Sequence, residues 1–332
     1  MQQPTPVENG FAGELQGQYT SMKERRDPSG PYSVGVDGGG TKTLAIVVDA
    51  QGHECGRGLA GSANHSAVGY QQAAHHIHSA IEQAAEAAGC QLPLSSAWLG
   101  IAGMDRPADH DELLSHLQAL AKVIYLVGDA ELVLSGLDQA VGVALIAGTG
   151  SIALGRDARG KTARAGGWGH ILGDEGSGYE IAHLALQAAV RAADGRGPMT
   201  SLLELVMQHW QLNEASDIID KVYPPKDKGH IASLSALVFT AARTGDQVAR
   251  RIIQHAANEL ALAAVTVGAA LSFPTNQLPL ALSGGLLVHE KDFRQQVIRC
   301  IRRRCPTGQV VVVDQPAISA ARAALTLRAV PM

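Results

Sequence analysis

The sequence contains two stretches of similar pattern, in each of which a glycine turn joins two apolar runs. The first, VGVDGGGTKT at 34–43, leads from the run SVGVD into TLAIVVD. The second, VALIAGTGSIALGRDARG at 143–160, repeats the turn chemistry 108 residues later, with six identities in the thirteen positions aligned with 40–52. Two strands joined by a tight turn form a hairpin. Each stretch therefore predicts a β-hairpin, and the repeat predicts a duplicated unit.

The first glycine turn approaches two phosphate-binding patterns and satisfies neither. Gly35 and Gly40 have the Walker spacing, but Thr41 stands where the lysine belongs and Lys42 comes one place late. The dinucleotide pattern G-x-G-x-x-G fails because Thr43 takes the place of its third glycine. A P-loop also leads from a strand into a helix, whereas a second strand follows here. Any phosphate binding is therefore expected from a hairpin.

Two glycine hairpins facing each other across a cleft can present backbone N–H groups to one polyphosphate from two sides. Glycine lets the main chain approach phosphate oxygens, and successive N–H groups form an anion-binding concavity. The threonines add hydroxyl donors and the lysine adds a positive charge. The candidate phosphate-binding residues are Gly38, Gly39, Gly40, Thr41 and Lys42 in the first hairpin and Gly148, Thr149 and Gly150 in the second. Two ordinary tight hairpins are the structural alternative, and their matched spacing favours phosphate binding.

Asp37 stands directly before the first turn. A carboxylate does not bind phosphate by itself, but it fits such a place if Mg²⁺ lies between them. This ion usually binds through few carboxylates together with waters and phosphate oxygens. We therefore expect Asp37 to hold Mg²⁺ through water.

Composition excludes several classes of function. The 332 residues carry a formal net charge of −4 with a pI near 6.3, so no overall basic field attracts nucleic acid or an anionic membrane. The one basic cluster, RCIRRRC at 299–305, is interpreted as a solvated helix face. Four cysteines without C-x-x-C spacing argue against a disulfide framework or a zinc site and favour a cytoplasmic location. No apolar run is long enough to predict a membrane span.

Beyond the two hairpins, strands alternate with helices, which predicts an α/β fold. Helices are expected at 68–88, 109–121, 178–193, 199–210, 230–244 and 246–271, and further strands at 96–103, 122–129, 278–284 and 309–314. We expect two lobes with a cleft between them. The first comprises 33–142, joined by a C-terminal helix at 316–332, and the second comprises 143–315 with helical insertions. Residues 1–32 are polar and are interpreted as a flexible tail outside the fold.

Five segments occur in the order that is typical of one family: DGGGTKT at 37–43, GDA at 128–130, AGTGS at 147–151, GGWGHILGDEGSG at 166–178 and LSGG at 282–285. Together they resemble the N-acetylglucosamine kinases, which belong to the sugar kinase, Hsc70 and actin superfamily near the BadF/BadG/BcrA/BcrD-type ATPases. The resemblance covers the chain from about residue 33 onward. It implies two ribonuclease-H-like lobes that close over ATP and an amino sugar, with Mg²⁺ as cofactor and transfer to the sugar 6-hydroxyl. It also suggests a homodimer.

Asp129 follows a predicted strand at its carboxyl end, where the sites of α/β proteins gather. Its carboxylate there can accept a proton from a hydroxyl that attacks the γ-phosphate. Position alone leaves a second interpretation open, in which Asp129 only caps the following helical segment. The resemblance favours the first interpretation, because GDA matches the position of the family's catalytic and substrate-binding aspartate.

The segment GGWGHILGDEGSG predicts a sugar pocket. Trp168 offers an apolar face to a sugar ring, Gly167 and Gly169 leave room beside it, and the Asp174 carboxylate can accept hydrogen bonds from hydroxyl groups. Core packing of the tryptophan and helix capping by the acids are the structural alternatives. Through the resemblance, Ser151 and Asn64 are further substrate-binding candidates, and Gly284 and Gly285 are candidates for the adenosine site. An Asx turn is the alternative for Asn64, and the roles of His170 and Glu175 stay open.

The resemblance predicts an ATP:amino-sugar 6-phosphotransferase, with N-acetylglucosamine as the favoured substrate and glucosamine or N-acetylmuramic acid as alternatives. One alternative of another class is an ATPase that activates a radical dehydratase. Such proteins hold an iron–sulfur cluster with cysteines near the phosphate motifs, and the cysteines here lie elsewhere in the sequence. A non-catalytic sugar sensor is the other alternative. The segment before residue 33 is short and polar for a helix-turn-helix, and Asp129 is present.

Overall fold

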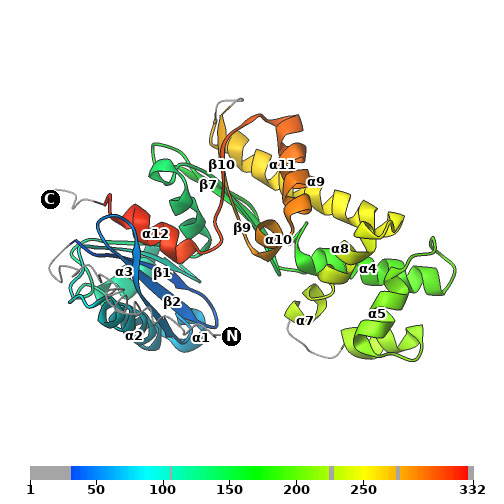
Figure 1. The fold of residues 1–332 in the computed structure, drawn as a ribbon, viewed down its shortest axis with the longest axis horizontal. Helices are drawn as coiled ribbons and strands as arrows, with labels where there is room; N and C mark the ends of the chain where they lie inside the picture. The colour runs from blue at the N-terminus through cyan, green and yellow to red at the C-terminus, as the bar shows by residue number, and fades with distance from the viewer. Residues whose placement is uncertain (1–30, 105–106, 224–227, 274–276, 328–332) are drawn as a thin grey trace, which may run out of the picture.

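A computed structural model describes residues 31–104, 107–223, 228–273 and 277–327. Two five-stranded sheets follow one another along the molecule, and a group of helices extends beyond the second sheet (Figure 1). The predicted tail lies outside the described residues as far as residue 30.

The first sheet combines a three-stranded antiparallel meander with two parallel strands. In spatial order its strands are β3 (Glu54–Ala60), β2 (Thr43–Val48), β1 (Ser33–Gly38), β4 (Ser96–Ile101) and β5 (Ile124–Gly128). Neighbouring strands of the meander are antiparallel, whereas β4 is parallel to both β1 and β5. The carboxyl ends of β1, β4 and β5 therefore meet at one edge of the sheet.

The second sheet repeats this topology. In spatial order its strands are β8 (Thr162–Gly166), β7 (Ser151–Arg156), β6 (Gly142–Ala147), β9 (Leu278–Ser283) and β10 (Thr307–Val312). The first three again form an antiparallel meander, and β9 again lies parallel to both of its neighbours. The two sheets thus share strand order and orientation, as a duplicated unit requires.

The two glycine hairpins differ by one residue in their turns. The first turn comprises 39–42 and the second comprises 148–150. As a result, β7 starts 108 residues after β2, as the sequence comparison indicates, whereas β6 starts 109 residues after β1. The predicted hairpins are present, but the gapless alignment holds only from the turn onward.

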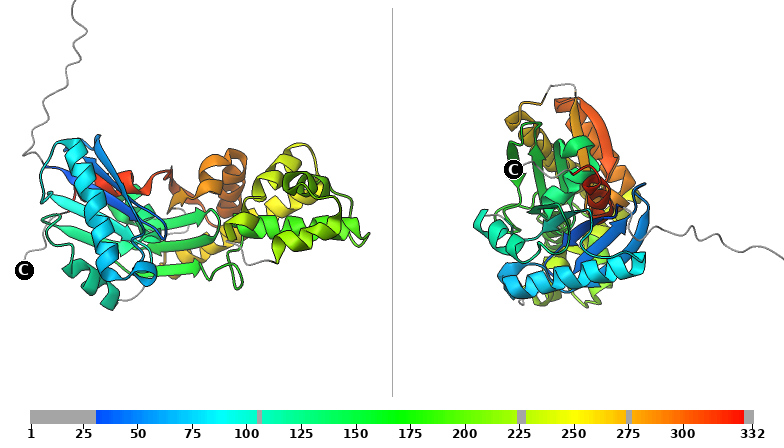
Figure 2. Two further views of the ribbon diagram at one scale, coloured as in Figure 1. Left: turned by 90° about the horizontal axis from the view of Figure 1, so that it is seen from below. Right: turned by 90° about the vertical axis from the view of Figure 1, so that its left-hand side faces the viewer.

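Both faces of the first sheet are covered by helices. The β2 side chains Ala45 and Val47 pack in one cluster with α2 (Tyr70–Ala88), whereas Ile46 and Val48 pack against α12 (Pro316–Ala324) on the other face. Figure 2 shows α2 across the outer face of this sheet. The short helices α1 (His65–Val68) and α3 (Pro107–Ser115) lie in the same lobe, and the 3₁₀ helices η1 (Ala130–Gly136) and η2 (Asp138–Ala140) follow β5.

Gly35 explains why the first turn resembles a P-loop. A Cβ atom at this position would lie 2.0 Å from the Ala317 carbonyl oxygen, so any side chain would displace α12 from the sheet. The glycine that completes the Walker spacing therefore serves helix packing. The last helix ends at Ala324, well before the predicted limit of 332, although 328–332 lie outside the described residues.

The second sheet packs against the long helices α9 (Gln247–Ala270) and α11 (Lys291–Arg304), with α10 (Gly285–His289) directly after β9. The helices inserted between β8 and α9 are α4 (Gly178–Ala193), α5 (Leu202–Trp210), α6 (Ile218–Val222), α7 (Lys228–Ala232) and α8 (Ser235–Arg243), with the 3₁₀ helix η3 (Ala215–Asp217). The helix expected at 230–244 was wrong as one element, because residues 233–234 separate α7 from α8. The helix expected at 109–121 ends at Ser115.

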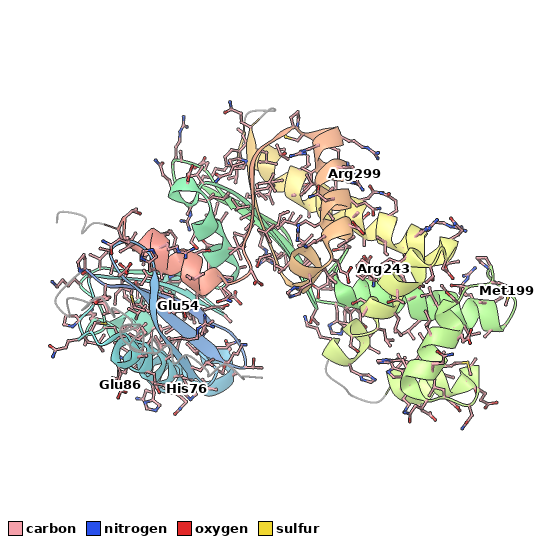
Figure 3. The ribbon with its side chains drawn as sticks, in the orientation of Figure 1. Glu54, His76, Glu86, Met199, Arg243 and Arg299 are labelled. Carbon is pink, nitrogen blue, oxygen red and sulfur yellow. The ribbon has the colours of Figure 1, made fainter. Side chains whose placement is uncertain are left out.

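The basic cluster of α11 is a solvated helix face, as expected. Arg299, Arg302 and Arg303 are exposed, while Val297 and Ile301 pack into the core (Figure 3 labels Arg299). Within the described ranges, no helix combines the length and the apolar character needed to cross a membrane.

Candidate active site

A cleft of about 640 Å³ lies between the lobes, and loops of both lobes line it. The first lobe contributes Asp37 at the end of β1 and Asp129 after β5. The second lobe contributes its glycine hairpin, the GDEGS segment and the turn after β9. Predicted residues that line this first cavity are Asp37, Asp129, Gly150, Ser151, Gly167, Gly169, Asp174, Gly284 and Gly285.

A second cavity of about 590 Å³ adjoins the first. It extends between the loop after β4, represented by Gly103 and Met104, and strand β8, represented by Thr162 and Arg164. The residues common to both cavities are Asp129, Ala130, Ile152 and Gly167. Asp129 is the one ionisable residue among them, so its carboxylate stands where the two cavities meet.

Asp129 follows β5 directly and begins the 3₁₀ helix η1. One of its carboxylate oxygens accepts a hydrogen bond from the Ala130 backbone N–H at 2.8 Å. The residue is nevertheless exposed to the cleft. The sequence left helix capping and catalysis as alternative roles for Asp129, but the geometry permits both. One carboxylate oxygen accepts the hydrogen bond that caps η1, while the carboxylate lines both cavities.

Asp37 and Asp129 influence each other electrostatically. Burial raises the pKa of Asp37, the neighbouring Asp129 carboxylate raises it further, and Lys42 acts in the opposite direction. A half-buried carboxylate beside a second one is a place where a cation is favoured. Among the described residues, no group of three or more His, Cys, Asp or Glu side chains forms a metal cluster. Mg²⁺ does not need one, because waters and phosphate oxygens complete its shell, so the residues present fit this ion.

The second glycine hairpin is tied to the start of α4. The Gly178 backbone N–H donates to the Gly148 carbonyl at 2.8 Å, and the Tyr179 N–H donates to the Thr149 carbonyl at 3.2 Å. With these two carbonyls engaged, the hairpin is held against the helical insertion. This bracing supports a rigid turn at the cleft.

Asp174 forms a hydrogen bond to the same hairpin. Its carboxylate is buried and accepts a hydrogen bond from the Ser151 N–H at 3.2 Å. It also lies so close to Gly150 that a Cβ atom added there would be only 2.9 Å from it, which leaves no room for a side chain at position 150. The Ser151 hydroxyl donates to the Glu175 carbonyl at 2.7 Å. Asp174 has a left-handed backbone with φ of 64°, which Asp tolerates better than most residues. The substrate-binding candidates Ser151 and Asp174 thus also fix the conformation of the second glycine hairpin at the cleft.

Lys228, at the start of α7, brings a positive charge to the first cavity. Its ammonium group lies 3.6 Å from the second oxygen of Asp174, which is buried and has no hydrogen-bond partner among the described residues. Lys228 and His289 are the described basic residues in the lining, which also contains Asp37, Asp129 and Asp174. The lysine side chain is 40% exposed, so it remains available to an anion in the cleft.

The turn after β9 approaches the end of β6 closely. Gly284 has φ of 86°, and a Cβ atom there would lie 2.4 Å from the Ala147 carbonyl oxygen, so only glycine fits. The Ser283 hydroxyl donates a hydrogen bond to the Val313 carbonyl at 2.7 Å and thereby links β9 to the residue that follows β10. Both glycines predicted for the adenosine site, Gly284 and Gly285, line the first cavity.

Several predicted phosphate ligands do not line either cavity. These are Gly38, Gly39, Gly40, Thr41, Lys42, Gly148 and Thr149. Gly38 is buried, and a Cβ atom there would lie 2.5 Å from the Ile101 side chain, so close packing requires glycine at this position. Thr41 and Lys42 are exposed at the tip of the first hairpin.

The two remaining sugar candidates lie at the margin of the second cavity. Asn64 caps α1 by accepting a hydrogen bond from the Ser66 N–H at 3.0 Å, which is the Asx turn considered from the sequence. Its amide oxygen would lie 3.0 Å from a Cβ atom on Gly103, a residue that lines the cavity. Trp168 is 64% exposed, so core packing does not explain it, but the Arg164 guanidinium lies over its ring at 4.7 Å.

Sequence reasoning missed several residues that line the cavities, among them the charged or titratable residues Lys228, His289, Asp314, Arg164 and Glu131. A signal existed for Asp314, because it lies just beyond the carboxyl end of the apolar strand β10, and the sites of α/β proteins gather at such ends. Lys228 belongs to an insertion without a recognisable motif. Arg164 lies in the strand TARAG, which has no apolar pattern and was not predicted.

Two sheets of one topology, a cleft between them and a glycine hairpin from the second lobe at that cleft define a two-lobed, actin-like ATPase. The chain belongs to the BadF/BadG/BcrA/BcrD ATPase family, because the sequence model of that family matches residues 34–325. The fold expected from the resemblance is thereby confirmed.

Named relatives and solved structures agree with this assignment. The N-acetylmuramic acid/N-acetylglucosamine kinase of Clostridium acetobutylicum is 35% identical over 262 residues, which cover 77% of this chain and 85% of the relative. The N-acetyl-D-glucosamine kinase of Dictyostelium discoideum is 32% identical over 309 residues, covering 88% and 97%. The crystal structure of a candidate N-acetylglucosamine kinase from Chromobacterium violaceum superimposes with a TM-score of 0.66 at 28% identity, covering 89% and 98%.

Proposed function

We propose that this protein is an ATP:amino-sugar 6-phosphotransferase whose favoured substrate is N-acetylglucosamine. The observation that carries the proposal is the position of Asp129, whose carboxylate lines both cavities at their junction. A kinase needs two substrates in separate pockets and one acceptor of the hydroxyl proton between them. Both relatives that are at least 30% identical are named as kinases of N-acetylglucosamine.

ATP occupies the first cavity in this proposal, with adenosine toward Gly284 and Gly285 and the polyphosphate beside Gly150. Lys228 supplies positive charge on the phosphate side. Thr41 and Lys42 approach the phosphates from the first lobe when the lobes close. Closure also excludes water, which suppresses wasteful hydrolysis of ATP.

Asp37 would hold Mg²⁺ through water, and the ion would neutralise negative charge on the phosphate oxygens. The raised pKa of Asp37 supports this placement, because burial and the neighbouring Asp129 carboxylate outweigh the opposing effect of Lys42 and a further cation would be favoured there. Asp129 also lies close enough to contribute to the negative field that attracts the ion.

The sugar occupies the second cavity with its 6-hydroxyl at Asp129. The hydroxyl oxygen forms a bond to the γ-phosphorus while the bond from that phosphorus to the bridging oxygen of ADP breaks. The hydroxyl proton passes to the Asp129 carboxylate, and the products are sugar 6-phosphate and ADP. Because the transition state of phosphoryl transfer is loose, orientation of the hydroxyl contributes alongside proton removal. The Ala130 N–H that fixes Asp129 serves this orientation.

Asn64, Gly167, Trp168, Gly169, Ser151 and Asp174 complete the proposed substrate and hairpin contacts. The alternatives from the sequence are glucosamine or N-acetylmuramic acid as substrate, an ATPase activator of a radical dehydratase, and a sugar sensor. The four cysteines of the chain line neither cavity, which favours the kinase over the activator. A homodimer and a cytoplasmic location remain predictions.

A coupled ADP-release assay with MgATP tests the proposal. The panel comprises N-acetylglucosamine, glucosamine, N-acetylmannosamine, N-acetylmuramic acid, glucose and no sugar. We expect strong turnover with N-acetylglucosamine and little without sugar. ADP release that does not depend on sugar, or no release at all, would overturn the kinase assignment and favour the ATPase or the sensor.

A further inference from the structure

Glu131 lines the second cavity and follows Asp129 by two residues. It lies in the first turn of η1, the 3₁₀ helix that Asp129 caps. Arg156 donates a hydrogen bond to the Glu131 carboxylate, and the side chains of this pair are only 13% and 32% exposed. The start of η1 is therefore held by Arg156 as well as by its own cap.

Arg156 belongs to the other lobe. It is the last residue of β7 in the second sheet, whereas Glu131 follows β5 of the first sheet. Among the ion pairs that join two described residues, this is the one that crosses from one lobe to the other. The Arg156 guanidinium also lies over the ring of Tyr125 at 5.5 Å, and Tyr125 belongs to β5, the strand that leads to Asp129. One side chain of the second lobe thus contacts the chain before and after Asp129.

The apolar face of η1 packs between the two sheets. Leu132, Val133 and Leu134 are buried in one cluster with side chains from strands of both sheets, among them Trp98, Val127, Ala144, Leu154 and Ala281. Apolar packing is not directional, whereas a charge-assisted hydrogen bond has a defined geometry. The cluster therefore holds η1 at the junction of the lobes, and the ion pair fixes how the helix is oriented there.

Arg156 itself lines neither the first nor the second cavity. It lines a separate cavity of about 660 Å³ together with Tyr125. Any effect of Arg156 on the reaction must therefore pass through the residues that it contacts. Phosphoryl transfer depends on the alignment of the attacking hydroxyl with the γ-phosphate, and small errors of position are costly.

We propose that Arg156 acts through Glu131 as a positioning residue, which fixes Asp129 relative to the lobe that holds the polyphosphate of ATP. Asp129 belongs to the first lobe and the second glycine hairpin belongs to the second, so a link between the lobes at η1 sets the distance from base to phosphate. This inference rests on the proposed function and adds to it a residue outside both substrate cavities.

The test is a double-mutant cycle on turnover. The variants are Arg156→Gln, Glu131→Ala and the two combined, with Arg156→Lys as the conservative replacement and Arg159→Gln as the matched control. Arg159 is exposed in the turn before β8 and lines neither cavity. We would measure kcat and the KM values for ATP and N-acetylglucosamine. Calorimetric titration with MgATP gives the fraction of intact sites, so that kcat is expressed per intact site.

Arg156→Gln should lower kcat per intact site by about 10- to 100-fold and leave both KM values close to those of wild type. Glu131→Ala should lower kcat to a similar extent. Once Glu131 is replaced, Arg156→Gln should have little further effect on kcat, because the interaction is already absent. Arg156→Lys keeps the charge but not the planar donor fork and should give an intermediate kcat. Arg159→Gln should leave kcat unchanged.

Two results would overturn the inference and leave the proposed function intact. One is a kcat per intact site that stays at the wild-type value in Arg156→Gln while the fraction of intact sites falls, which would limit the pair to stability. The other is a pair of single-variant effects that add in the double variant, which would show that Arg156 does not act through Glu131. If Arg156→Gln does not fold, Glu131→Ala decides, and a wild-type kcat in that variant would overturn the inference. Absence of turnover by the wild-type protein with every sugar would instead remove the proposed function, and the inference with it.

Discussion

The Asp174 carboxylate accepts a hydrogen bond from the Ser151 backbone N–H at 3.2 Å and so joins the GDEGS segment to the second glycine hairpin. The same carboxylate faces the Lys228 ammonium group at 3.6 Å. One buried acid thus shapes a turn at the cleft and holds a cation beside it.

Replacement of Asp174 should separate these two roles. Asp174→Asn keeps an oxygen acceptor for Ser151 and tolerates the left-handed backbone, so the free energy of unfolding should stay close to wild type. Asp174→Ala leaves a buried N–H unpaired and should cost about 1–3 kcal/mol. Denaturant unfolding of both variants measures the difference. Equal stability of the two would contradict a bracing role.

Lys228 should contribute to the binding of ATP more than to the binding of sugar. Lys228→Ala is expected to raise the KM for ATP by about 10-fold, the effect of one lost charge-assisted contact, and to change the KM for sugar little. Lys228→Arg should recover part of the loss, and Lys221→Ala, in the neighbouring helix α6, serves as control. A rise confined to the sugar KM would place Lys228 on the other substrate.

Asp37 should destabilise the ligand-free protein, yet it should be required for the binding of MgATP and for turnover. Its folded-state pKa lies above the unfolded value, so the ionised carboxylate costs stability at pH values above the folded pKa, and this cost disappears as the pH falls through it. Asp37→Asn should therefore raise the Tm of the ligand-free protein at neutral pH. It should also abolish the Tm increase caused by MgATP and lower turnover by about 100-fold or more. A variant that keeps the full MgATP-induced increase would disprove metal binding at Asp37.

Asp246 should be a determinant of stability outside the cleft. Partial burial alone would raise its pKa, but hydrogen bonds from the Ala249 N–H, the Thr200 hydroxyl and Ser201 lower the pKa to about 2. Because the folded-state pKa is depressed, this stabilisation is present above the usual value of 3.8 and is lost as the pH falls toward about 2.

Asp246→Ala removes the N-cap of α9 and its link to the start of α5, and should cost about 1–2 kcal/mol at pH 7. Unfolding measured from pH 7 to pH 2 should show the difference from wild type shrinking below about pH 4. A difference independent of pH would contradict the assignment to the ionised carboxylate.

The architecture was predictable because local chemistry repeats in the sequence. A glycine turn between two apolar runs indicated a hairpin at both places, and the recurrence of the pattern indicated two lobes. Strand β8 was not predictable in this way, since TARAG is an edge strand without apolar alternation. The break between α7 and α8 was also missed, because the apolar periodicity continues across residues 233–234.

The candidate site was predictable where a motif carries it, as with Asp129, Asp174 and Gly284. Residues brought in by distant elements were not. Lys228 reaches the cleft from an inserted helix. Arg164 meets Trp168 because Gly166 and Gly167, with φ of 74° and 72°, turn the chain between them. Gly35 shows the opposite case. It completes a spacing typical of a phosphate-binding motif, but the structure requires glycine there because α12 packs directly against it.

In the proposed mechanism Asp129, at the junction of the two cavities, accepts the proton of the sugar hydroxyl. The most direct test measures sugar 6-phosphate formation in a single turnover by wild type and Asp129→Asn, together with calorimetric binding of N-acetylglucosamine and MgATP. We expect both ligands still to bind the variant while the rate falls by about 100- to 10,000-fold. A rate near that of wild type would contradict it.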